Sequence, residues 1–174
     1  MDCLAVVFFF QTMAASESSW RRTPFTEGVP ILYRANFDME QFARLKKGHI
    51  PHGMDDKWFV YYAEPHLFFH RSWTGRPVYR LTLKTRPEGA EVLEALWSRD
   101  LAASSKKGPD YERHLLDFLV SNLILGEAKP FPLPPGLGPP TDGAFQHNVS
   151  GTGYPEAAPL KEPRPQAKPW WQFW

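Results

Sequence analysis

Four residues close together in the chain have side chains suited to chemistry: His70, Arg71, Trp73 and Arg80. Arginine guanidinium groups bind phosphate and carboxylate through paired hydrogen bonds. An indole ring stacks on a flat ring or on a cation, and a histidine titrates near neutral pH, so that it can act as an acid or a base. These residue types together predict a binding site for an anionic group attached to a flat ring.

Each of these residues also has an ordinary structural interpretation. His70 can be a buried, hydrogen-bonded histidine of the core. Arg71 and Arg80 can form ion pairs with surface carboxylates or pack their stems over aromatic rings. Neighbouring residues of a strand point to opposite faces of the sheet, so His70 and Arg71 are not expected to act on the same ligand atom. The candidate ligand-binding set is therefore Arg71, Trp73 and Arg80, with His70 as a weaker member.

Other motifs for catalysis or metal binding are missing from the sequence. It contains no phosphate-binding loop, dinucleotide-binding fingerprint, paired-histidine zinc motif or nucleophile elbow. His49 and His52 lie in an expected loop around Pro51 without a supporting cysteine, and Asp55 and Asp56 fit a turn better than a cation site. We therefore expect no metal and no cofactor, and catalytic residues stay unassigned.

Composition limits the kinds of partner. The 174 residues contain 20 lysines and arginines against 19 acidic residues, for a formal net charge of +1. This balance provides no general field for nucleic acid or for an anionic membrane. The single cysteine, Cys3, excludes an internal disulfide and suits a reducing compartment. The apolar run of residues 4–10 is too short to span a bilayer, so we expect a cytoplasmic protein.

The candidate site falls within three adjoining strands, expected over residues 58–63, 67–73 and 78–84. All three segments are rich in aromatic and β-branched residues, and turn residues separate them. This pattern is typical of an antiparallel β-meander.

The loop lengths set the expected register. A three-residue first loop and a two-residue second turn place His70 opposite Val60 and Tyr79. The more apolar face, expected to meet the helices, then carries Trp58, Val60, Tyr62, Phe68, His70, Ser72, Tyr79, Leu81 and Leu83. Arg71 and Arg80 lie diagonally on the other face, within reach of the same ligand. A one-residue change in the first loop would turn the first strand over without altering the relation between His70, Arg71 and Arg80.

Helices are expected on both sides of these strands in the sequence. Asp38 and Gln41 fit a capping box and Gly48 fits a helix stop, so a short helix lies between them. Its inward face is expected to carry Met39, Phe42 and Leu45.

Two further helices are expected over residues 88–101 and 110–125. The apolar residues of the first recur at helical spacing: they are Val92, Leu93, Leu96 and Trp97. The second has Asp110 as its expected N-cap and Gly126 as its stop. The expected fold class is α+β, a small antiparallel β-meander of three to four strands packed against two to three helices, with disordered termini.

The chain divides into three parts by composition. Residues 1–28 are expected to be an extension that is disordered or reflects a misassigned start; a cleaved signal peptide or a structural strand are the alternatives. Residues 29–129 form a single α+β domain. Residues 130–174 hold most of the 18 prolines and are expected to be a disordered tail. Its aromatic end, residues 169–174, is either a docking peptide or a terminus that folds back or hangs free.

The motifs around the candidate site resemble those of a small family of bacterial proteins. They are DKWF at residues 56–59 and FHRSWTG at residues 69–75, and the similarity extends over about residues 32–83. The resemblance implies no established activity, so it adds no site residue to those named above.

Two classes of function follow from these observations. The first is a binding or accessory module that uses an Arg/Trp sheet face to engage an anionic ligand or a protein partner. The second is an enzyme or sensor for a phosphorylated, nucleotide-like or ADP-ribose-type small molecule. The absence of a paired acid–base or nucleophile–base motif favours the first.

Overall fold

The structure of the protein is a computed structural model that describes residues 13–53, 55–134 and 149–151. The predictions made for residues 1–12 and for most of the proline-rich tail, including its aromatic end, lie outside the described residues.

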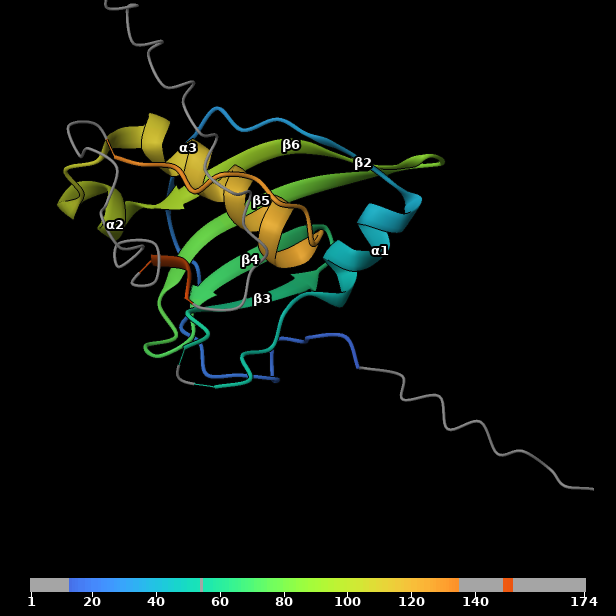
Figure 1. Cartoon of the computed structure of the whole chain (residues 1–174), viewed down its shortest axis with the longest axis horizontal. Coiled ribbons are helices and arrows are strands. Elements are labelled where there is room, and N and C mark those ends of the chain that lie inside the picture. The colour runs from blue at the N-terminus through green and yellow to red at the C-terminus, as the bar shows by residue number, and fades with distance from the viewer. Residues whose placement is uncertain (1–12, 54, 135–148, 152–174) are drawn as a thin grey trace, which may run out of the picture.

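One antiparallel sheet forms the centre of the fold (Figure 1). Its strands are β1 (Gly28–Pro30), β2 (Asn36–Asp38), β3 (Trp58–Ala63), β4 (His66–Arg71), β5 (Pro77–Arg86) and β6 (Gly89–Ser98). Their order is β1-β6-β5-β4-β3, and β2 also pairs with β6. The predicted α+β class is confirmed, but the sheet has six strands where three to four were expected.

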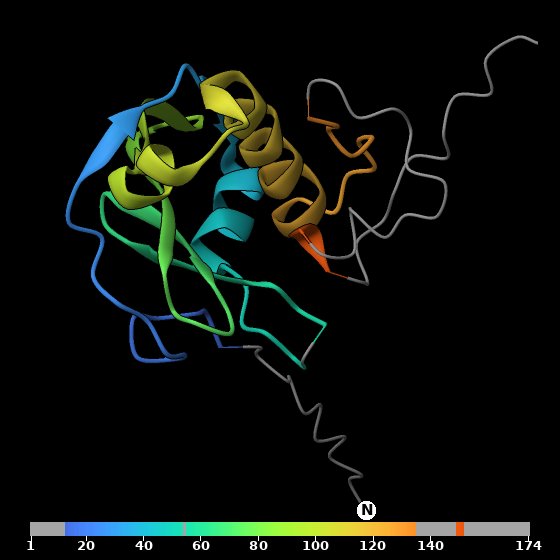
Figure 2. The same cartoon turned by 90° about the vertical axis from the view of Figure 1, so that its left-hand side faces the viewer.

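Helices cover one face of this sheet (Figures 1 and 2). They are α1 (Met39–Lys47), the short α2 (Arg99–Ser104), α3 (Gly108–Phe118) and the π-helix η1 (Leu119–Ile124), which continues α3. The opposite face packs against residues 13–27, from which Ala15 and Trp20 contact aromatic side chains of β3 and β4. These residues, which the sequence assigned to the extension, thus form part of the packed structure.

Helix α1 begins and ends as the sequence predicts. The Asp38 side chain accepts a hydrogen bond from the Gln41 backbone N–H (2.8 Å), and the Gln41 side chain accepts one from the Asp38 backbone N–H (3.1 Å). This is the reciprocal capping box. Gly48 follows the helix with φ 67°, and a Cβ there would collide with the Val60 carbonyl oxygen. Met39, expected to face inward, is instead 59% exposed.

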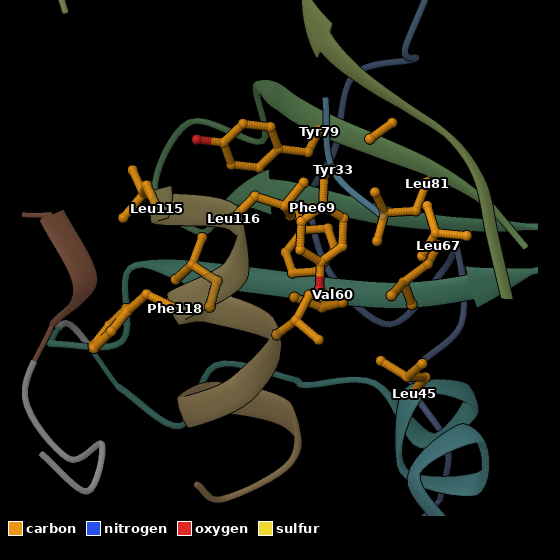
Figure 3. Packing of buried hydrophobic residues seen from close by; sticks show 14 of the residues in the cluster. Tyr33, Leu45, Val60, Leu67, Phe69, Tyr79, Leu81, Leu115, Leu116 and Phe118 are labelled. Atoms are coloured by element: carbon orange, nitrogen blue, oxygen red, sulfur yellow. The ribbon is translucent and has the colours of Figure 1, made fainter. Parts of the chain in front are cut away.

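The main core lies between the sheet and the helices (Figure 3). Its fully buried members come from every layer and include Leu45, Val60, Leu67, Phe69, Tyr79, Leu81, Leu116 and Leu119. A smaller cluster on the other face contains Ala15, Phe59 and Tyr61. The sheet is therefore covered on both faces near β3 and β4. This packing holds in place the part of the sheet where the candidate site lies.

Residues 89–98 form strand β6, so the helix predicted over residues 88–101 is wrong. The Ala, Glu and Leu residues of this segment favour a helix, and their spacing imitates one. Pairing with β5 along the length of the strand overrides this local preference. Leu93, expected on the apolar stripe, is 47% exposed.

Both turns of the meander differ from the expected register. The first loop is shorter than predicted, because Ala63 pairs with His66, and Phe59 rather than Val60 lies opposite His70. A β-bulge between Phe69 and His70 then shifts the pairing with β5. The bulge changes the relation between the second strand and the third, which was expected to be unaffected by the length of the first loop.

As a result, β4 is turned over relative to the prediction. Phe69 is buried in the main core, while Phe68 packs on the other face. His70 was expected on the helix face and Arg71 on the opposite face; their positions are reversed. Arg80 pairs with Phe68 and therefore shares the face away from the helices.

Helix α3 starts earlier than expected. Its N-cap is Lys107 and its first turn contains Pro109, so the N-cap assigned to Asp110 is wrong. The helix widens to the π form at Leu119 and its continuation ends before Gly126, which has φ 70°. Glu112 lies on the inward side of α3, where it is buried and bonded to Tyr79 of the sheet.

Candidate functional site

A pocket of about 690 Å³ opens at one end of the sheet, on the face that the helices cover. Its walls come from the start of β3, the end of β4 and the turn after it, the start of β5, the end of β6, and helices α2 and α3. The polar and aromatic side chains that line it are Lys57, Trp58, Arg71, Ser72, Trp73, Thr74, Arg76, Tyr79, Trp97, Ser104, Ser105, Lys107 and Glu112. The volume is within the range of small-molecule sites.

Arg71 and Trp58 form one wall of the pocket. They are direct cross-strand partners in β4 and β3, so their side chains share a face. The Arg71 guanidinium lies 4.8 Å from the centre of the Trp58 ring, and the Trp58 ring stacks on Tyr79 with centroids 6.1 Å apart. The stacked rings of Trp58 and Tyr79 hold the Arg71 guanidinium in a fixed position at the edge of the apolar core. A cation held in this way can bind an anion in a partly dehydrated site.

Further cations lie around the rim, each close to an aromatic ring. The Lys57 ammonium is 4.9 Å from the centre of the Trp73 ring, and the Lys107 ammonium is 4.8 Å from that of Tyr111. Trp73 is 54% exposed and presents a flat apolar surface at the entrance. Together with Arg71 and Arg76, these lysines give the described part of the lining an excess of positive charge, since Glu112 is its single carboxylate among the residues that the structure describes.

Tyr79 and Glu112 form the floor. The Tyr79 hydroxyl donates a hydrogen bond to Glu112 Oε2. In Figure 3 this hydroxyl points toward Leu115 of α3. Burial raises the pKa of the Glu112 carboxyl, while the hydrogen bond from Tyr79 and the charge of Lys107 oppose that shift. Burial and the adjacent Glu112 raise the pKa of Tyr79 well above its usual value. The floor therefore offers a carboxyl that can accept hydrogen bonds and that holds a proton more readily than an exposed glutamate does.

The backbone of Val149 forms the last part of the lining. Its carbonyl oxygen accepts hydrogen bonds from Arg71 Nη1 (2.8 Å) and from Trp58 Nε1 (3.0 Å). Residues 149–151 thereby lie across one side of the pocket although they are far from it in sequence.

The pocket contains two of the four predicted site residues, Arg71 and Trp73. His70 lies on the opposite face, fully buried in the aromatic cluster, where its Nδ1 is 3.0 Å from the Gly75 carbonyl oxygen. Burial lowers the pKa of His70, and the hydrogen bond to Gly75 opposes this shift. Of the alternatives that the sequence left open, its position matches the core histidine.

Arg80 is also outside the pocket. On the far face of the sheet its guanidinium lies 3.4 Å from Glu94 Oε2 and 5.3 Å from the centre of the Phe25 ring. This matches the structural alternative of an ion pair and stem packing over an aromatic ring. The expectation that Arg71 and Arg80 share a ligand is wrong, because the sheet separates them.

The sequence left several residues of the pocket unrecognised. Trp58 and Tyr79 were assigned to the core, which is correct but incomplete, because both also line the pocket. Glu112 was not singled out, although a signal existed: it precedes Leu115 and Leu116 by the helical spacing of an inward face, where an acidic residue is unusual. Lys57 and Lys107 carried no signal, because lysines beside turns are common on surfaces.

The described part of the chain holds neither a metal-binding cluster nor a membrane-spanning helix. In residues 13–53, 55–134 and 149–151 no group of three or more His, Cys, Asp or Glu side chains is arranged to hold a metal ion. None of the helices within those ranges is long and apolar enough to cross a membrane. His49 and His52 instead lie 3.8 Å and 3.6 Å from the carboxylate oxygen of Asp56.

Comparison with known proteins gives no relative: no protein-family model, curated protein or solved structure matches this chain. The family resemblance inferred from the DKWF and FHRSWTG motifs stays a prediction.

Proposed function

We propose that the protein is a small binding module whose pocket takes up an anionic molecule that carries a flat ring, of the phosphorylated, nucleotide-like class. The observation that carries this proposal is the joint placement of Arg71, Lys57 and Lys107 around stacked aromatic rings in one pocket. Guanidinium and ammonium groups bind phosphate oxygens, and the exposed face of Trp73 suits stacking with a heterocycle.

Glu112 narrows the class of ligand that the pocket is proposed to bind. A carboxylate within a cationic pocket repels a second anionic group but accepts hydrogen bonds from hydroxyl or amino groups. Glu112 Oε2 accepts the hydrogen bond from Tyr79, and the Glu112 side chain lines the pocket. A ligand with an anionic end near Arg71 and a hydrogen-bond donor near Glu112, as in a sugar phosphate or a nucleotide, satisfies both groups.

A thermal-shift experiment with the full chain tests this proposal. Nucleotides, ADP-ribose and inorganic phosphate are added separately, and each variant is compared with its own ligand-free state. A ligand present at 100 times its Kd adds about 2.7 kcal/mol of stability, which corresponds to roughly 5–10 °C in Tm for a chain of this size. The shift should be lost in Arg71→Ala.

Arg80→Ala is the matched control, since it removes the same side chain from the opposite face of the sheet. It should keep the full ligand-induced shift. Equal responses of the Arg71 and Arg80 variants, or no shift with any of these compounds, would contradict the proposed function.

The alternative is an enzyme or sensor that acts on the same class of molecule. A buried carboxyl with a raised pKa in a pocket favours this alternative, since such groups are frequent among catalytic acids and bases. Turnover of an ADP-ribose-type compound that Glu112→Gln abolishes, while binding is retained, would establish it. Binding without turnover would leave the binding module as the function.

A further inference from the structure

The Val149 carbonyl oxygen occupies the position where the donors of the pocket converge. Arg71 Nη1 and Trp58 Nε1 come from neighbouring strands and point at this one oxygen, at 2.8 Å and 3.0 Å. Convergent donors from a rigid sheet, directed at a single point, are what an oxyanion site requires. The carbonyl oxygen therefore marks the point where the pocket can hold an oxygen atom of a ligand.

A neutral carbonyl is not the strongest acceptor for these donors. Hydrogen bonds from a guanidinium to an ionised acceptor are shorter and about twice as strong as those between neutral groups. The stacking of Arg71 on Trp58 fixes the guanidinium at this point, so little reorganisation is needed when the acceptor changes. A phosphate or carboxylate oxygen placed here would bind these donors more strongly than Val149 does.

Packing and backbone conformation hold the segment that supplies the carbonyl, since Val149 packs against the main core. Ser150 is fully buried, and Gly151 has φ 88°, a conformation that residues with a side chain rarely adopt. A Cβ at residue 151 would collide with the Asp55 carbonyl oxygen and lie 3.4 Å from the Lys57 side chain. The substitution Gly151→Ala should therefore displace the segment without replacing any side chain that lines the pocket.

We propose that the position of the Val149 carbonyl oxygen is the oxyanion subsite of the pocket, and that residues 149–151 compete with a phosphate or carboxylate group for it. The inference rests on the proposed function, because it names the point at which the anionic end of the ligand binds. The proposal adds that the Val149 carbonyl oxygen occupies this subsite when no ligand is bound. Binding then requires that a ligand oxygen replace this carbonyl oxygen as the acceptor for Arg71 and Trp58.

Gly151→Ala tests the competition, and Gly126→Ala is its matched control. Gly126 has a similar φ of 70°, but the nearest atom to a Cβ there is 3.9 Å away, so the control carries the conformational strain without the collision. Isothermal titration with inorganic phosphate, and with ADP as a nucleotide, measures the affinity of each full-length protein. We expect Gly151→Ala to bind about tenfold more tightly than the native chain, equivalent to about 1.4 kcal/mol, and Gly126→Ala to match the native chain.

Hydrogen–deuterium exchange on the native protein provides a second measurement that needs no variant. Saturation with the same ligand should increase exchange in peptides that contain residues 149–151, because a ligand that replaces the Val149 carbonyl displaces the segment and exposes its backbone N–H groups to solvent. If a ligand binds while these peptides stay equally protected, or if Gly151→Ala weakens binding, the competition is refuted and the proposed function stands. If neither the native chain nor Gly151→Ala binds phosphate or ADP, the subsite and the proposed function both fail.

Discussion

Replacing Tyr79 with phenylalanine would test the hydrogen bond at the floor of the pocket. Tyr79 is fully buried, and its hydroxyl donates to Glu112 Oε2. Phenylalanine keeps the ring that stacks on Trp58 and removes only the donor. Glu112, which is 7% exposed, then remains as a buried carboxylate that has lost the hydrogen bond opposing the rise of its pKa.

The expected loss depends on the charge of Glu112. A hydrogen bond to a charged group contributes about 1.5–3 kcal/mol, and one between neutral groups about 1 kcal/mol. Burial raises the pKa of Glu112 above its ordinary value of 4.5, so at pH 4.5 most of the folded protein has this carboxyl protonated. A raised carboxyl pKa means that the contribution of Glu112 to stability falls as the pH increases above 4.5. Tyr79→Phe should therefore lower the free energy of unfolding by about 2 kcal/mol at pH 8 and by about 1 kcal/mol at pH 4.5.

Urea denaturation at both pH values, with Glu112→Gln and the double variant, measures this difference. Glutamine keeps an acceptor oxygen without the charge, so in that background Tyr79→Phe should cost about the same small amount at both pH values. The reasoning is refuted if Tyr79→Phe in the native background costs equal amounts at pH 4.5 and pH 8. It is also refuted if the loss at pH 8 is below about 0.5 kcal/mol, the usual scale of a surface change.

Three other substitutions test the burial of individual side chains. Burial lowers the pKa values of His70, His49 and His66, so the contribution of these histidines to stability is full above about pH 6.5. That contribution falls on acidification, by up to about 1.4 kcal/mol per pH unit for each proton taken up. His70→Phe should reduce the slope of urea midpoint against pH between 6.5 and 5, and an unchanged slope would count against burial of an uncharged ring. Leu116→Ala should lower the free energy of unfolding by about 2–5 kcal/mol. The control Leu32→Ala, at a site that is 84% exposed, should change this free energy by less than about 0.5 kcal/mol. Similar losses in the two variants would contradict the assigned core.

Features determined by local chemistry could be predicted from the sequence. The capping box of Asp38 and Gln41 and the stop at Gly48 depend on residues within one helix, and helix α1 has those ends. Strand β3 has its predicted bounds because its aromatic residues stand between clear turn residues. The α+β class follows from such elements together.

Features determined by pairing across the sheet could not be predicted in this way. The segment of β6 has helix-forming residues, and only its partner strand β5 makes it extended. The β-bulge at Phe69 and His70 is a property of the strand pair, and it separates Arg71 from Arg80. Of the four predicted site residues, Arg71 and Trp73 consequently line the pocket and His70 and Arg80 do not. Glu112 reaches the pocket from a helix whose position no strand pattern could indicate.

Residues 28–38 lie beside β6 and cover its outer edge. Its two ends form β1 and β2, which pair with opposite ends of β6. Between them, the Ile31 N–H donates to the Ala95 carbonyl and the Val92 N–H donates to the Ala35 carbonyl. The outer edge of a ten-residue strand is thus occupied along most of its length.

An open strand edge can pair with the edge of another molecule and start aggregation. At the opposite side of the sheet, His49 and Val60 exchange backbone hydrogen bonds across the outer edge of β3. The segments before and after α1 therefore each shield one edge of the sheet. These two segments thereby reduce the number of unpaired backbone groups that the edges of the sheet offer to another molecule, a role separate from that of the pocket.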